Sequence, residues 1–115
     1  MTQEDKQLLV KDLSARLPYK VIIKSVGENK ILGLWDLKDI DNLPLPYLRP
    51  MSTMTEEEKE GYCNLQAKFL CSNQYLVTDA YELFDWLNKN HFDYRGLIPK
   101  DLAIEVTKEN NPYKD

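Results

Sequence analysis

The chain has 115 residues, 43% of them hydrophobic and 30% charged, and it carries a net charge of −4. This size and composition predict one globular domain with its own core, spanning residues 1–108, and a polar, frayed tail at 109–115. The acidic balance disfavours nonspecific binding to nucleic acid, and the lack of a long apolar run excludes a membrane-spanning helix.

The first predicted element is a helix over residues 2–17. Thr2 and Asp5 have the spacing of a capping box, in which each side chain accepts a hydrogen bond from the backbone of the other residue. Leucines recur at helical spacing along one side of this segment. Pro18 ends the helix, because proline disfavours helical geometry in the residue before it.

A β-hairpin is predicted next. The segment VIIKSV at 21–26 is rich in β-branched residues and is typical of a strand. Residues 27–29 supply a turn, and residues 30–37, KILGLWDL, form the second strand. Trp35 lies inside this strand pattern, which favours a position in the core.

The segment 38–54 has no helical period. It contains LPLPYLRP, whose three prolines favour an extended connector. A second helix follows at 55–72, with Thr55 as the N-cap and Glu58 as its capping-box partner. The glutamates around Glu58 fit a helix start better than a calcium site, because neighbouring helical side chains point about 100° apart.

The remaining elements are short. A strand at 75–77 leads to a third helix that begins at Asp79, with Glu82 as the capping-box partner. Pro99 fits the first turn of a short helical segment, and residues 104–106 are expected to form a last strand or an ordered extension. Together the elements predict an α+β fold, with about three helices packed on a small antiparallel hairpin or sheet.

No catalytic, cofactor-binding or metal-binding motif is present, and the single histidine excludes a multi-histidine metal site. Cys63 and Cys71 lie in one predicted helix, roughly 12 Å apart, which is too far for a disulfide bond. We therefore expect two reduced thiols that fill small spaces in the core of a cytoplasmic protein without a cofactor. The polar N-terminal residues also lack the pattern of a secretory signal.

Candidate contact residues lie in two segments, YLRPM at 47–51 and HFDYRG at 91–96. The residues of YLRPM are not needed to cap the second helix. If the 91–96 loop is extended, its histidine, aspartate and arginine point one way and its aromatic rings the other. A structural role is favoured for this loop over ligand binding and catalysis. The six candidates for partner or ligand contact are Tyr47, Arg49, Met51, His91, Asp93 and Arg95.

Three stretches carry a family resemblance: KQLLVKDLSARLPYKV, YLRPMSTMTEEEK and FDWLNKNHFDYRGLIPKDLA. In this order they resemble a group of small uncharacterised proteins of gut bacteria, commonly encoded near prophage or other mobile-element genes. The resemblance implies a bacterial, cytoplasmic protein with a single domain. It does not imply an enzyme, and it carries no catalytic residue over to this chain.

These observations favour a noncatalytic protein-interaction or accessory module in a mobile-element setting. The edge of the predicted hairpin could accept a strand from a protein partner. Trp35, Tyr47 and Trp86 are further candidates for an interface, because large aromatic residues dominate contact energies. Two alternatives stay open: a small ligand-binding protein or enzyme that uses loop 91–96, and a nucleic-acid-associated regulator.

Overall fold

The computed structural model describes residues 2–25, 27–71 and 77–113. Within them lie three α-helices and four strands, which confirms the α+β class. The helices are α1 (Gln3–Arg16), α2 (Glu56–Cys71) and α3 (Val77–Lys89). The strands are β1 (Ile22–Ser25), β2 (Glu28–Ile31), β3 (Leu45–Leu48) and β4 (Ile104–Glu105). None of the described helices is both long and apolar enough to cross a membrane.

The four strands form one mixed sheet in the order β2-β1-β3-β4. β1 is antiparallel to both β2 and β3, so that Ile23 lies opposite Lys30 on one side and Pro46 on the other. β4 runs parallel to β3, with Tyr47 opposite Ile104. The sheet is therefore mixed and not purely antiparallel. Parallel strands need a long crossover connection, and the segment with α2 and α3 provides it between β3 and β4.

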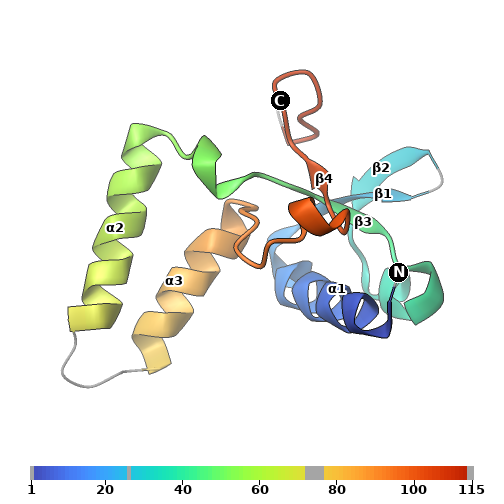
Figure 1. Ribbon diagram of the computed structural model, residues 1–115, viewed down its shortest axis with the longest axis horizontal. Coiled ribbons are helices and arrows are strands. Elements are labelled where there is room, and N and C mark those ends of the chain that lie inside the picture. Colours follow the sequence, from blue (N-terminus) through green and yellow to red (C-terminus); the bar gives the residue numbers. More distant parts are fainter. Residues whose placement is uncertain (1, 26, 72–76, 114–115) are drawn as a thin grey trace.

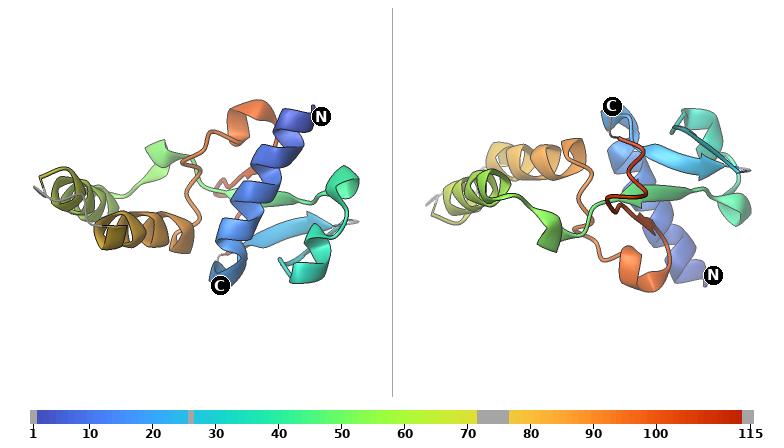
Figure 2. Two further views of the ribbon diagram at one scale, coloured as in Figure 1. Left: turned by 90° about the horizontal axis from the view of Figure 1, so that it is seen from below. Right: turned by 90° about the horizontal axis from the view of Figure 1, so that it is seen from above.

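α1 crosses one face of the sheet, and the segment after β4 lies over the opposite face (Figure 2). The helix begins at the predicted capping box, in which the Thr2 Oγ1 atom accepts from the Asp5 N–H at 3.0 Å. Leucines on the sheet side of α1 enter the main core and add hydrophobic stabilisation of about 2 kcal/mol each. This core contains Leu9, Leu13, Val21, Ile23, Leu32, Leu48, Leu97, Leu102 and Ala103.

α2 and α3 form a helical hairpin that lies to one side of the sheet (Figure 1). A second hydrophobic cluster holds this hairpin to the chain segments that enter and leave it. Its buried members are Leu83, Leu87 and Phe92, and half-buried side chains such as Met51 and Trp86 pack against them. The described residues therefore form two hydrophobic clusters where the sequence predicted one core.

The predicted second strand is too long, because β2 ends at Ile31. The Gly33 N–H donates to the Asp36 carboxylate at 2.8 Å, and the Asp36 N–H donates to the Gly33 carbonyl at 3.0 Å. These two bonds close a 3₁₀ helix over Leu34–Leu37. Trp35 is consequently turned out of the sheet and is 81% exposed, so its predicted core position is wrong.

The predicted connector at 38–54 also contains a strand, which its prolines made difficult to predict. β3 lies inside it and pairs with two neighbours, because proline fixes an extended backbone and only removes a donor. α3 begins at Val77, before the predicted Asp79, while residues 75 and 76 of the predicted short strand lie outside the described residues. The short helix at Pro99 and the strand after it are confirmed.

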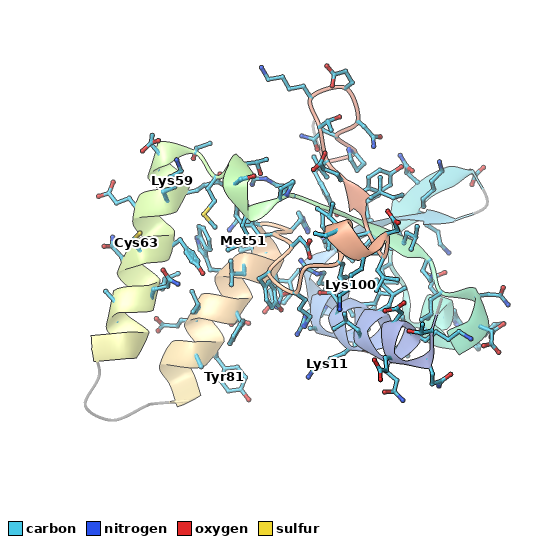
Figure 3. All side chains as sticks on the ribbon, viewed as in Figure 1. Lys11, Met51, Lys59, Cys63, Tyr81 and Lys100 are labelled. Carbon is cyan, nitrogen blue, oxygen red and sulfur yellow. The ribbon has the colours of Figure 1, made fainter. Side chains whose placement is uncertain are left out.

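One other expectation fails at the surface. Cys63 is exposed on α2 and does not fill the core (Figure 3), while the side chain of Cys71 lies outside the described residues. Within the predicted tail, Tyr113 contacts two strands of the sheet. The hydroxyl of Tyr113 donates to the Tyr47 carbonyl at 2.7 Å and accepts from the Ile22 N–H at 2.9 Å.

Candidate interaction surfaces

Arg49 joins three parts of the chain. Its guanidinium donates two hydrogen bonds to the Glu58 carboxylate, at 2.8 and 2.7 Å, and lies 4.3 Å from the centre of the Phe92 ring. The Arg49 backbone exchanges hydrogen bonds with residues 91 and 93, so that loop 91–96 runs beside it. The hydrogen bonds from Arg49 lower the pKa of Glu58. The contacts of Arg49 therefore connect the end of β3 to α2 and to loop 91–96.

The other two candidates in YLRPM also contact the rest of the chain. The ring of Tyr47 is only 4% exposed, and its hydroxyl donates to the Asn29 amide oxygen at 2.9 Å. Met51 is half-buried and packs against the second hydrophobic cluster. Thr55 and Glu58 form the predicted capping box of α2. The segment thus stabilises the fold, with Tyr47 buried and Met51 half-buried.

Loop 91–96 does not alternate as an extended strand would. His91 has a positive φ of 61°, which redirects the chain and places Phe92 in the core. The Asp93 carboxylate accepts from the backbone N–H groups of Leu97 and Ile98, at 2.8 and 2.9 Å. Arg95 instead pairs with Asp12 of α1. The histidine, aspartate and arginine of the loop therefore engage separate partners and do not converge on one point.

A buried ion cluster lies under this loop. The Asp12 carboxylate accepts from Arg16 Nε at 2.8 Å and from an Arg95 terminal nitrogen at 2.9 Å. Arg16 also donates to the Phe92 carbonyl at 2.6 Å, and both Asp12 and Arg16 are fully buried. No sequence motif predicts this cluster. Its only local signal is the spacing of Asp12 and Arg16, four residues apart on the helix face that carries Leu9 and Leu13.

His91 is stacked on the ring of Tyr113, with the ring centres 3.9 Å apart and the planes at 8°. Its Nδ1 atom is buried and has no hydrogen-bond partner within the described residues. Burial, together with the positive charges of Arg16 and Arg49, lowers the pKa of His91 to about 4. The folded protein therefore holds this imidazole neutral at pH values where an unfolded chain would protonate it.

We expect this difference to make stability depend on pH. An unfolded histidine has a pKa of about 6.5, so between pH 6.5 and 4 the unfolded chain binds a proton that the folded chain excludes. The free energy of unfolding should fall as pH decreases through this window. His91→Asn, which tolerates the positive φ, should remove about 1–2 kcal/mol of this loss after solvent screening is allowed for. Urea unfolding at pH 7 and pH 4.5 measures it, and equal pH dependence in both proteins would contradict it.

The most exposed apolar side chains of the described residues lie at the opposite end of the molecule from the helical hairpin. Trp35 is 81% and Leu34 is 72% exposed, on the 3₁₀ helix Leu34–Leu37. With Leu37 and Lys38 they line a hollow of about 360 Å³. We call these four residues the Trp35 surface. The Lys38 ammonium lies 5.7 Å from the centre of the Trp35 ring, so the two side chains share the same patch.

A larger hollow of about 540 Å³ adjoins this surface, and Trp35 lines both. Two of its acidic side chains already have partners. Asp36 pairs with Lys30 at 2.7 Å, and Asp41 pairs with Lys6 at 2.6 Å. The hollow is therefore bounded by the Trp35 ring and by acidic side chains, two of which are already in ion pairs. No grouping of histidine, cysteine and carboxylate side chains suited to a metal ion occurs among the described residues.

No protein-family model matches the chain, and comparisons with curated proteins and with solved structures give no significant match. The interpretation of the surfaces therefore depends on their own chemistry.

Proposed function

We propose that this chain is a noncatalytic protein-interaction module of the bacterial cytoplasm and that a partner protein docks on the Trp35 surface. The observation that carries the proposal is the exposure of two adjacent large apolar side chains, Leu34 and Trp35. Burying such side chains against a partner is favourable, and tryptophan is prominent among the residues that dominate binding energies. The resemblance to proteins encoded near mobile-element genes supports an accessory role in that setting.

The partner should present an apolar pocket that receives the Trp35 ring. Trp35 separates two hollows, so the partner surface would fit around it on both sides. Addition of a partner strand to β2 is less favoured, because that edge is four residues long and carries Glu28 and Lys30. Short, charged edges of this kind oppose strand pairing. Side-chain burial, not backbone pairing, is therefore expected to provide the affinity.

The two alternative functions receive less support. A ligand-binding or catalytic role for loop 91–96 needs His91, Asp93 and Arg95 to converge, whereas each engages a different partner. A role on nucleic acid needs a basic surface, whereas the chain carries a net charge of −4.

Trp35→Ala should abolish partner binding while changing the free energy of unfolding by less than about 0.5 kcal/mol, because the ring is exposed. The measurement is affinity capture from the native host after chemical cross-linking, with the wild type and the variant compared side by side. In a second experiment Trp86→Phe leaves Trp35 as the single tryptophan. Its fluorescence should then shift to shorter wavelength when the purified partner binds.

The matched control is Tyr81→Ala, which removes another exposed aromatic ring far from the Trp35 surface. This variant should retain every partner that Trp35→Ala loses. The proposal is wrong if Trp35→Ala captures the same proteins as the wild type. It is also wrong if the Trp35 surface is covered by a second copy of the chain, which would appear as a dimer that Trp35→Ala converts to a monomer.

A further inference from the structure

Residues 106–113 follow β4 and form a strap over the face of the sheet opposite α1 (Figure 2). The strap begins where the Val106 N–H donates to the Leu48 carbonyl at 2.9 Å. The side chains of residues 107–111 are exposed, whereas Tyr113 packs against the main core. The strap is therefore fastened to the body of the protein at its two ends, and the ring of Tyr113 is the fastening at the second end.

The Tyr113 hydroxyl bridges two strands of the sheet. β1 and β3 are paired at Ile23 and Pro46. The next residues of these two strands are Ile22 and Tyr47. The hydroxyl accepts from the Ile22 N–H at 2.9 Å and donates to the Tyr47 carbonyl at 2.7 Å. A phenol can both donate and accept, and here the sheet backbone uses both capacities. Burial raises the pKa of Tyr113, which keeps the donated proton on its oxygen.

The ring of Tyr113 meets a flat aromatic surface. It stacks on the His91 imidazole, with the ring centres 3.9 Å apart and the planes at 8°. The His91 carbonyl accepts from the Arg49 N–H at 2.8 Å, which holds this residue beside the end of β3. The stacking surface, the apolar core, one N–H donor and one carbonyl acceptor together form a site that matches a phenol.

This site favours a phenol over a benzene ring. A ring without a hydroxyl would leave the Ile22 N–H and the Tyr47 carbonyl without their shared partner, and unpaired polar groups in a buried place are costly. A site built to bond a ligand hydroxyl rejects the analogue that lacks it for this reason. The residues that form the site belong to β1, β3 and loop 91–96, so their positions do not depend on the strap.

We propose that this is a tyrosine-recognition site, which Tyr113 fills in the free chain and which a tyrosine of a partner protein occupies when the strap is displaced. Tyr113 itself identifies the occupant, because it is the side chain seated in the site. A ligand on the same chain has a high effective concentration, so the strap limits access and acts as an autoinhibitory segment. The site shares no residue with the Trp35 surface and does not depend on the function proposed for it.

Tyr113→Ala removes the occupant and gives a direct test. The probes are N-acetyltyrosinamide and N-acetylphenylalaninamide, which differ by one hydroxyl group. In Tyr113→Ala, the tyrosine amide should shift the backbone amide NMR signal of Ile22 in a saturable way. The phenylalanine amide should bind at least about tenfold more weakly, because it leaves the two backbone groups unpaired.

The wild type should bind the tyrosine amide at least about tenfold more weakly than Tyr113→Ala does, because its own ring competes for the site. As the amide replaces the strap in the wild type, the signals of Ile22 and of the Tyr113 ring should move together. The matched control is Tyr81→Ala, which removes an exposed tyrosine from α3 and should bind as the wild type does.

Circular dichroism checks that Tyr113→Ala is folded. Tyr113→Phe keeps the ring and tests the same site independently, since hydrogen exchange of the Ile22 amide should rise at least about tenfold when its acceptor is lost. The proposal is overturned by unchanged Ile22 exchange in Tyr113→Phe, by no saturable Ile22 shift in Tyr113→Ala, or by equal binding of the two amides. Equal binding of the tyrosine amide by wild type and Tyr113→Ala, or an Ile22 shift in the wild type without a Tyr113 shift, also overturns it. A wild-type dimer that Tyr113→Ala converts to a monomer would assign the site to a second copy of the chain instead.

Discussion

Replacing Asp12 with alanine is expected to lower the free energy of unfolding by about 3–5 kcal/mol. Asp12 is fully buried and accepts hydrogen bonds from both Arg16 and Arg95. Without it, the buried guanidinium of Arg16 has no opposite charge beside it, and Arg95 adds a like charge nearby. The main cost is the desolvation of an unpaired cation, not the loss of the pair itself.

Equilibrium urea denaturation measures this effect, and a double variant gives the control. Asp12→Leu with Arg16→Met replaces the ion pair by apolar side chains of similar size, which is often neutral or stabilising. The double variant should therefore recover most of the stability that Asp12→Ala loses, although the Phe92 carbonyl loses its donor. If Asp12→Ala costs less than about 1 kcal/mol, the cluster does not have the importance that its burial indicates.

Phe92→Ala should also cost about 3–5 kcal/mol, but its effect should be uneven along the chain. The Phe92 ring is fully buried, stacks on Trp86 at 5.6 Å between ring centres, and carries the Arg49 guanidinium on its face. These contacts connect α3 to the segment that leaves β3. Their loss should weaken attachment of the helical hairpin more than it weakens the sheet.

Hydrogen exchange detected by mass spectrometry would show this difference. Amides of α2 and α3 should lose more protection than those of α1 and β1, because the second hydrophobic cluster loses a central member while the main core is intact. Phe84→Ala is the matched control, since that ring is 45% exposed and should cost about 1 kcal/mol or less. A uniform loss of protection over all elements would show that the two clusters unfold as one unit.

The helix starts were predictable because their determinants are local. Thr2 with Asp5, and Thr55 with Glu58, are three residues apart, and each pair makes the reciprocal hydrogen bonds that its spacing indicates. The 3₁₀ helix at Trp35 was missed although it is also local. The strand propensity of this segment is overridden by the hydrogen bond from the Gly33 N–H to the Asp36 carboxylate. This bond ends the strand and exposes the tryptophan.

Other features depend on residues that are far apart in the sequence. Arg95 and Asp12 are 83 residues apart in the sequence, and Tyr113 and Tyr47 are 66 apart, so no short sequence pattern predicts either contact. The prolines of β3 disfavour a strand in any local pattern, and the strand forms because β1 and β4, which are distant in the sequence, pair with it. The two segments that contain the sequence-predicted contact residues lie side by side at Arg49 and Phe92. Their side chains make contacts within the chain.

The parallel bridge between Arg49 and Phe92 places the points where the chain leaves the sheet and returns to it side by side. Everything between them, residues 51–90, contributes no strand to the sheet among the described residues. Such an arrangement makes the helical hairpin an insertion in architectural terms. A designer could exchange it for another element of equal end-to-end span, provided that the replacement supplies an apolar cover for Phe92 and a carboxylate for Arg49. The same position is where this fold could gain or lose a binding element in evolution without rebuilding its sheet.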